Sequence, residues 1–156
     1  MKHLSIIGLC LGLLLPTAAH AQVNARYVRV LNNETQELNL AELRVIHNGS
    51  NVALGKTVTA SSIYLNYEIF RGANLVDGNI ATFAHTDDAA NQWLEVDLGA
   101  VYALSSVEIV NRQDACCTWR SNNLQLVLKD GFGKLHVFQS MENFQHLQMA
   151  WMTLKG

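Results

Sequence analysis

Residues 111–120, which read NRQDACCTWR, bring together the residue types best suited to binding chemistry in this chain. An arginine lies on each side of two adjacent cysteines, and Asp114 lies between them. A guanidinium stays charged and carries a fixed fork of donors, so Arg112 and Arg120 can together hold vicinal hydroxyls or a carboxylate. The simpler interpretation is two surface arginines, one of them paired with Asp114. This segment alone leaves both interpretations open.

Cys116 and Cys117 allow several chemistries. Oxidised together, neighbouring cysteines close a small strained ring, which would place a flat apolar knob in the loop. Disulfides between two chains compete with that ring. A redox centre is less favoured because the chain has no Cys-x-x-Cys motif. A zinc site is also less favoured, since Cys10 lies far away in the apolar run at the start of the chain and no group of histidines lies nearby.

Further polar groups precede this segment. The side chains of Asn74, Asp77 and Asn79 surround a glycine, and such oxygen ligands suit a hard cation such as calcium. They suit an Asx-rich turn equally well. His85 is a single histidine whose position proves nothing by itself. The sequence contains no evident nucleophile and no persuasive pair of acid and base, so we do not expect an enzyme.

The start of the chain has the pattern of a secretory signal. Lys2 is followed by an apolar run over residues 4–15 and by Ala19-His20-Ala21, which fits a small-x-small cleavage site. The run is too short to cross a bilayer, which takes about 20 apolar residues. We therefore expect a signal peptide over residues 1–21, cleavage after Ala21, and a protein that is secreted to the extracellular medium or the periplasm, with no membrane insertion.

The length and the charge of the chain limit the number of domains and the kinds of partner that it can have. The chain has 156 residues, and residues 22–156 suit a single domain. The whole chain carries a formal charge of −2, from 11 basic and 13 acidic residues, and the basic residues form no cluster. We therefore expect no nucleic-acid partner.

The hydrophobic pattern has the period of strands. Alternating or short apolar runs, separated by Gly, Asn and Asp turns, fall at 27–31, 38–45, 93–98, 104–110, 124–128 and 135–138. This pattern predicts an all-β sandwich. A turn is expected at 32–35, and residues 66–91 show little regular pattern, which is typical of a functional loop. Residues 139–156 could form a strand or a short helix.

Taken together, these motifs resemble the F-type lectins, or fucolectins, of the discoidin (coagulation factor 5/8 type C) superfamily. The signature is a histidine, 26 residues, then Arg-x-Asp and a second basic residue, matched here by His85, Arg112, Asp114 and Arg120. The supporting frame is NVALGK, TASS, VDGN and WLEVDLG, at residues 51–56, 59–62, 76–79 and 93–99. The resemblance covers about residues 51–130 and implies a jelly-roll sandwich of discoidin type.

The resemblance also implies a function and a site. It implies that His85, Arg112 and Arg120 hydrogen-bond L-fucose and that a Cys116–Cys117 disulfide packs on the apolar edge of the sugar. Its methyl group would meet Phe83 or Tyr64, and Asp114 would orient an arginine. The partners would be fucosylated glycans, and a homo-oligomer would strengthen a weak single site. The alternative is a discoidin-like adhesion module that binds another glycan, a protein or a phospholipid.

The same resemblance implies a structural calcium ion. Asn74, Asp77 and Asn79 match the family's calcium motif. The closing hairpin of the family is found here at the front of the chain, over residues 25–30 and 38–45, as after a circular permutation. Glu42 becomes the candidate final ligand, with Ala41 beside it.

Three departures from the family pattern concern the binding loops. Ala115 is inserted between Asp114 and Cys116, the loop between Asn79 and His85 is short, and Gln92-Trp93 replaces a Pro-Trp-Trp.

Overall fold

The structure is a computed structural model, and it describes residues 22–114, 116–121, 123–139 and 149–153. The expected signal peptide and the inserted Ala115 lie outside these residues. The strands are β1 (Val23–Thr35), β2 (Asn39–His47), β3 (Ser50–Asn51), β4 (Thr57–Ala60), β5 (Ala84–His85), β6 (Ala90–Leu104), β7 (Ser106–Asn111), β8 (Leu124–Lys129), β9 (Leu135–Gln139) and β10 (Met149–Thr153). The short 3-10 helices are η1 (Tyr64–Asn66), η2 (Glu68–Phe70), η3 (Gly72–Val76) and η4 (Thr118–Ser121).

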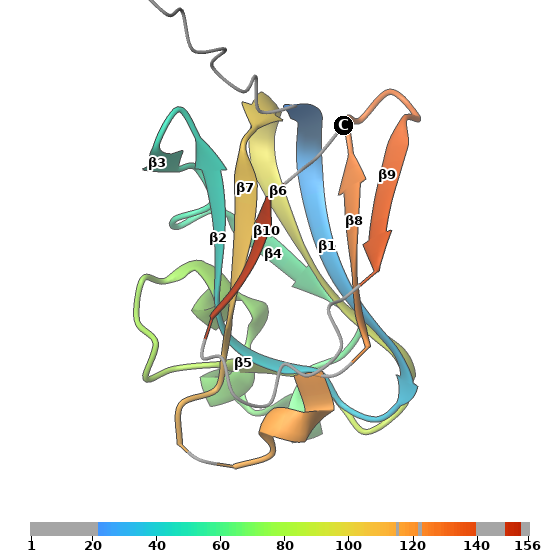
Figure 1. Cartoon of the computed structure of the whole chain (residues 1–156). Coiled ribbons are helices and arrows are strands. Elements are labelled where there is room, and N and C mark those ends of the chain that lie inside the picture. The colour runs from blue at the N-terminus through green and yellow to red at the C-terminus, as the bar shows by residue number, and fades with distance from the viewer. Residues whose placement is uncertain (1–21, 115, 122, 140–148, 154–156) are drawn as a thin grey trace, which may run out of the picture.

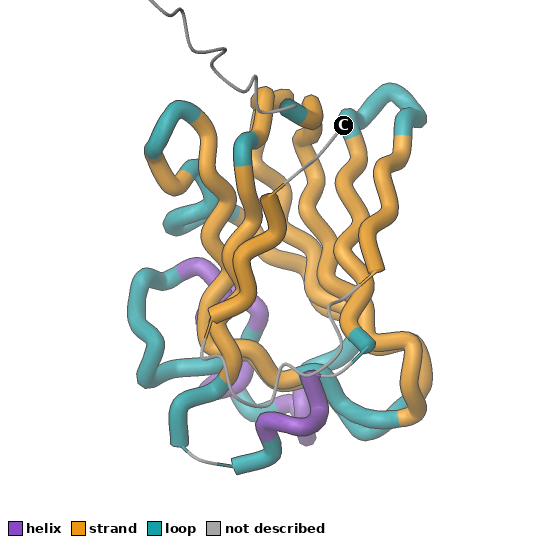
Figure 2. The backbone as a smooth tube through the Cα atoms, in the orientation of Figure 1, coloured by secondary structure: helices purple, strands orange, loops and turns teal. Residues whose placement is uncertain are grey.

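The strands form two sheets that pack face to face (Figures 1 and 2). The first sheet has the order β4-β6-β1-β8-β9, and the second has the order β10-β7-β2-β3, with β5 paired to β2. The strand pairs are antiparallel. The predicted all-β, discoidin-like sandwich is confirmed.

The core lies between the sheets and follows from the alternation in the sequence. Along β8, for example, Leu124, Leu126 and Leu128 are buried, whereas the residues between them face outward. Each fully buried Val or Leu contributes about 1.5–3 kcal/mol. The core includes Val28, Val30, Leu43, Val45, Leu94, Val96, Val107, Leu126 and Leu128.

The first two strands of the chain occupy the middle of the two sheets. β1 lies between β6 and β8, and β2 lies between β7 and β3. The expectation that residues 25–30 and 38–45 form a closing hairpin is wrong, because β1 and β2 belong to different sheets and do not pair with each other.

Some local details differ from the sequence-based prediction. The turn expected at 32–35 is strand, because Asn32 is fully buried between Gln92 on β6 and Leu124 on β8. The short strands β3 and β4 were not predicted. In the ambiguous tail, residues 149–153 are a strand paired with β7, whereas 140–148 and 154–156 lie outside the described residues.

The irregular segment over residues 66–91 folds into two of the 3-10 helices, η2 and η3, and the strand β5. Together with η1 and η4 it lies at one end of the sandwich, and the β8–β9 turn lies at the opposite end (Figure 1). Within the described part of the chain, no helix has the length and apolar character needed to span a bilayer.

Candidate functional site

His85 is held by the pairing of β5 with β2. It lies opposite Asn39 in the antiparallel register. The next residue, Thr86, fixes the segment further, since its hydroxyl accepts the Leu38 N–H at 2.9 Å and its own N–H donates to the Leu38 carbonyl at 3.0 Å. This double link sets the position of His85 relative to the start of β2, where Glu37 precedes Leu38.

The neighbours of His85 determine the tautomer and the protonation of its imidazole ring. Nδ1 lies 2.7 Å from the Thr86 carbonyl oxygen, which can only accept, so Nδ1 carries the proton. Burial lowers the pKa of the imidazole, an effect opposed by the Thr86 hydrogen bond and the Glu37 charge. The neutral ring therefore presents Nε2 as an acceptor.

Arg112 follows β7 and is fixed by Asp114. Its Nε donates to Asp114 Oδ1 at 2.8 Å, and a second donor reaches Oδ2. Such a bidentate pair holds the guanidinium in one orientation, and the hydrogen bond to Arg112 holds the pKa of the Asp114 carboxyl below its usual value. The guanidinium also lies over the Phe83 ring, 4.1 Å from its centroid. Among the described residues no hydrogen bond involves the other terminal nitrogen of Arg112, which can meet a ligand.

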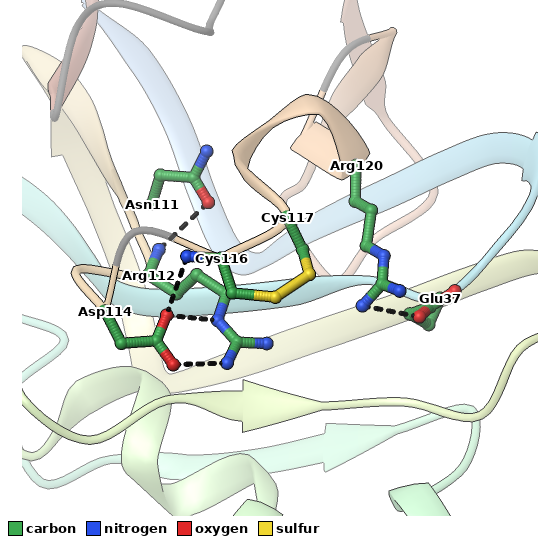
Figure 3. Close-up of a disulfide and its surroundings, with 7 residues drawn as sticks. All are labelled: Glu37, Asn111, Arg112, Asp114, Cys116, Cys117 and Arg120. Carbon is green, nitrogen blue, oxygen red and sulfur yellow. Dashed lines mark hydrogen bonds and ion pairs between the residues drawn. A yellow bond between two sulfur atoms is a disulfide. The ribbon is translucent and has the colours of Figure 1, made fainter.

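The adjacent cysteines are joined by a disulfide between Cys116 and Cys117. The loop bends sharply here, with Cys117 in the left-handed region at φ 63°, and the Cys116 N–H donates to Asp114 at 3.3 Å. Figure 3 shows the disulfide between the side chains of Arg112 and Arg120. The loop thus presents an apolar ledge flanked by two cations.

Arg120 lies on η4 and pairs with Glu37, with 2.6 Å between Nη1 and Oε1 (Figure 3). The Asn32 amide donates to the Arg120 carbonyl at 3.2 Å, which ties η4 to β1. The buried Nε of Arg120 has no hydrogen-bond partner among the described residues.

Glu37 was not anticipated from the sequence. It is a buried carboxylate, 7% exposed, that pairs with Arg120 and acts electrostatically on His85. The only sequence signal was a charged residue directly before the apolar run of β2, and nothing local links it to Arg120.

Aromatic rings form a wall around His85. The Tyr64 and Phe70 ring centroids lie 4.5 and 5.4 Å from that of His85, and the Phe83 centroid lies at 6.1 Å. The two expected apolar residues, Tyr64 and Phe83, therefore both lie beside His85. Phe70 completes the wall and was missed, because nothing in the sequence distinguishes it from a core residue.

Gln92, one of the departures from the family pattern, braces this wall. Its buried Oε1 accepts the hydroxyls of Ser61 and Ser62 at 2.7 and 2.6 Å. Ser62 Oγ in turn accepts the Asp87 N–H at 2.8 Å. The amide of Gln92 therefore connects β6 to the segments on both sides of the aromatic wall.

The candidate calcium ligands fall into two groups. Glu42 is fully buried on β2, next to Ala41, where the pairing of β2 with β7 is shifted. Both Glu42 oxygens accept the Gly78 N–H, at 3.3 and 3.2 Å. Burial and then the charge of Asp77 raise the pKa of Glu42 to about 7.

The other ligand candidates surround Gly78. Asp77 accepts the Asn79 N–H at 2.8 Å and the Thr82 hydroxyl at 2.7 Å. The Asn74 amide nitrogen donates to the carbonyls of Ile69 and Phe83 at 2.6 and 3.0 Å, and its oxygen accepts no hydrogen bond from the part of the chain that the structure describes. Among the described residues no three His, Cys, Asp or Glu side chains cluster as metal ligands. The carboxylates of Glu42 and Asp77, together with amide and backbone oxygens, nevertheless fit the preference of calcium for oxygen ligands.

Comparisons with known proteins agree with this architecture. Residues 74–148 match the family model of the F5/F8 type C domain, described as a NedA-like, galactose-binding domain. Fucolectin-6 of Anguilla japonica is 34% identical over 86 residues, which are 50% of this chain and 46% of the fucolectin. The chain thus spans about half the length of the curated relative it matches. No solved structure matches the chain.

The fold and the match to the family model define the class, a galactose-binding-like β-sandwich of the discoidin superfamily. Within this superfamily the chain is similar to the fucolectins, as its match to Fucolectin-6 indicates. The resemblance stated from the sequence motifs is confirmed.

Proposed function

We propose that this protein is a lectin that binds L-fucose on glycans through His85, Arg112 and Arg120. One observation carries the proposal: a buried neutral imidazole interacts electrostatically with two fixed guanidiniums, and an apolar disulfide ledge lies between those guanidiniums (Figure 3). The name of the similar Fucolectin-6 supports the same ligand class.

The three polar side chains divide the hydrogen bonds to the sugar. Neutral His85 offers Nε2 as an acceptor, so it binds a hydroxyl that donates to it. The ring oxygen of a sugar can only accept, so it must face one of the two arginines. Hydrogen bonds from a guanidinium to sugar oxygens are charge-assisted and therefore stronger than neutral ones.

The apolar parts of the site suit a 6-deoxy sugar. Phe83 and Tyr64 flank His85, and the ledge of Cys116 and Cys117 lies between the arginines (Figure 3). A methyl group gains free energy from contact with such surfaces, about 0.8 kcal/mol for each carbon that is buried. L-galactose, which has a hydroxymethyl group in place of the methyl group of L-fucose, should therefore bind less tightly.

Calcium supports the loops in this proposal. Glu42, Asp77, Asn74, Asn79 and Ala41 supply its ligands, and the ion would compensate the two carboxylates at Gly78. Asn74 also holds the Phe83 carbonyl, so the calcium ligands and the aromatic wall share one segment.

The proposal also includes secretion of the protein and its assembly into a homo-oligomer. A signal peptide over residues 1–21 would direct the protein to the extracellular medium or the periplasm. A single shallow site binds one sugar weakly, and a homo-oligomer would raise the avidity for glycans that carry several fucose units. We propose no enzymatic activity.

A glycan array combined with calorimetry tests the function. We expect the purified protein to bind fucosylated glycans and to prefer L-fucose over L-galactose by about tenfold. Arg112→Ala should abolish binding, whereas Arg71→Ala, at an exposed arginine outside the site, should not. Thermal melts of both variants establish that they are folded. An array without fucosylated hits, or full binding by Arg112→Ala, would contradict the proposal.

A second candidate function rests on the loop that carries η1 and η2. It exposes Leu65, Tyr67 and Ile69, the last 71% exposed, and exposed apolar side chains on one loop are typical of contact with a macromolecular partner. A discoidin-like adhesion module that uses this loop would bind its partner equally well in Arg112→Ala, which separates the two functions.

A further inference from the structure

A second cleft lies away from the proposed fucose site, on the outer face of the first sheet. It has a volume of about 520 Å³, which falls within the range of small-ligand sites, roughly 300–1,000 Å³. Its walls come from β1, β6, β8 and the β8–β9 turn, and that turn lies at the end of the sandwich opposite η4 (Figure 1). The lining residues are Tyr27, Glu95, Lys129, Gly131, Gly133, Lys134 and Leu135.

Strand register places the side chains of this cleft next to one another. Lys129 on β8 lies opposite Tyr27 on β1 and opposite Leu135 on β9. Directly paired residues of neighbouring strands point to the same face of a sheet. The cleft is therefore built from rigid strands on three sides rather than from a loop alone.

The cleft carries an excess of positive charge. The carboxylate of Glu95 already accepts both Arg29, at 2.8 Å, and Lys129, at 2.5 Å. Lys134 is exposed and has no ion-pair partner within the described parts of the chain. Among the lining residues two lysines face one carboxylate. The carboxylate of Asp130, at the start of the turn, already accepts the backbone N–H groups of Phe132 and Lys134, so the cleft keeps a net attraction for an anionic group.

An aromatic ring and a glycine-rich turn give the cleft its shape. Gly131 and Gly133 have φ angles of 90° and 107°, which favour glycine. A Cβ on Gly131 would lie 3.6 Å from the Tyr27 ring, and one on Gly133 would meet nothing within 4 Å. The turn therefore closes on the edge of Tyr27 without covering the cleft with side chains. A ring beside donors and an acceptor suits a sugar, which has an apolar C–H face and a rim of hydroxyls.

We propose that this cleft is a second saccharide-binding site, which takes a sugar unit that carries one anionic group, a sulfate or a carboxylate. Lys134 and Lys129 hold the anionic group, Glu95 accepts a hydroxyl, and Tyr27 packs against the sugar ring. The site does not depend on fucose binding. If the proposed fucose function also holds, one chain carries two glycan sites at opposite ends and bridges two glycans as a monomer.

Titrations followed by NMR of the whole protein test this site. The probes are a monosulfated disaccharide, the same disaccharide with a carboxylate in place of the sulfate, its neutral parent and a short polyglutamate peptide. We expect the sulfated or carboxylated sugar to shift the amide signals of Gly131 and Gly133 and to bind about tenfold more tightly than the neutral parent. The sulfated and the carboxylated disaccharide are then compared with each other, and the one that binds more tightly identifies the anionic group. Binding should weaken with salt, because exposed charges are screened.

Matched variants separate this site from general electrostatics and from the fucose site. Lys134→Glu should weaken binding of the anionic disaccharide at least about tenfold, whereas Arg71→Glu, with the same change in charge at an exposed position, should leave it unchanged. Arg112→Ala should also leave it unchanged, even though fucose binding is expected to be lost. Equal binding of the neutral parent or of polyglutamate, or an unchanged affinity in Lys134→Glu, would show that the inference is wrong.

Discussion

The carboxylate of Glu37 lies 2.6 Å from the guanidinium of Arg120, although the two residues are far apart in the sequence. Glu37 precedes β2, and Arg120 lies on the loop after β7. Both side chains are largely buried, so the pair is only weakly screened by water. The orientation of one proposed sugar-binding arginine therefore depends on the N-terminal part of the chain.

Replacing Glu37 by Gln should weaken fucose binding by about tenfold, because Arg120 loses the charge that orients it. Calorimetric titration with L-fucose measures the change. Glu34→Gln is the control, since Glu34 is an exposed residue of the same segment whose carboxylate accepts the Asn123 amide at 2.8 Å. If Glu37→Gln binds fucose as tightly as the parent protein, the ion pair does not position Arg120 for binding.

The titration of His85 should control fucose binding in acid. Burial lowers the pKa of His85 below 6.5, so the folded state binds this proton less readily than the unfolded state. Its contribution to stability is complete above about pH 6.5 and is lost as the pH falls toward the folded pKa. Protonation also removes the acceptor at Nε2. We expect affinity to be constant above about pH 6.5 and to fall as the pH approaches the lowered pKa of His85 in the folded protein.

NMR titration of the imidazole, in parallel with fucose binding, checks this expectation. The pKa of binding should coincide with that of His85, and fucose should lower that pKa further, because the sugar binds the neutral ring. A raised imidazole pKa in the complex would mean that His85 donates through Nε2 instead.

The vicinal disulfide should form within one chain. The intact mass of the non-reduced protein should be that of a monomer and about 2 Da below the dithiol mass. Replacing both Cys116 and Cys117 by Ser should lower the affinity for fucose, because the apolar ledge is lost, while the fold is retained. Covalent dimers in the non-reduced protein would contradict this assignment.

Calcium should stabilise the protein more at pH 8 than at pH 5. In the metal-free protein the pKa of Glu42 is raised from 4.5 to about 7, so its contribution to stability is present below about pH 4.5 and is lost as the pH rises through 7. A calcium ion binds the deprotonated carboxylate and reverses the loss.

Thermal melts with calcium and with a chelator, at both pH values, measure this difference. Glu42→Gln should melt at the same temperature with or without calcium. Glu108→Gln is a suitable control, because Glu108 is a buried carboxylate of the same sheet that pairs with Arg44. A calcium response that persists in Glu42→Gln would remove Glu42 from the set of ligands.

Much of the fold followed from the sequence, because a strand with one buried face repeats every second residue. Runs such as 124–128 therefore predicted β8 closely. The strand β4 was missed because its residues are only partly buried. The end of β1 was also misplaced, since Asn32 has the residue type of a turn but is held between two neighbouring strands.

The candidate site was predictable where its residues share one short segment. The pairing of Arg112 with Asp114 is local, two residues apart, and so is the bond between Cys116 and Cys117. Glu37, Phe70 and the bracing role of Gln92 were not predictable, because each depends on a partner from another part of the chain.

The sequence by itself determined the residue types, the strand period and the spacing of His85 from Arg112 that carries the family resemblance. Only the tertiary structure decided that Glu37 faces Arg120, that Nδ1 of His85 carries the proton, and that Tyr27, Lys129 and Lys134 line one cleft. The reason is physical: side-chain partners follow from the register of strands distant in sequence, and protonation follows from burial, which the packing of the two sheets sets.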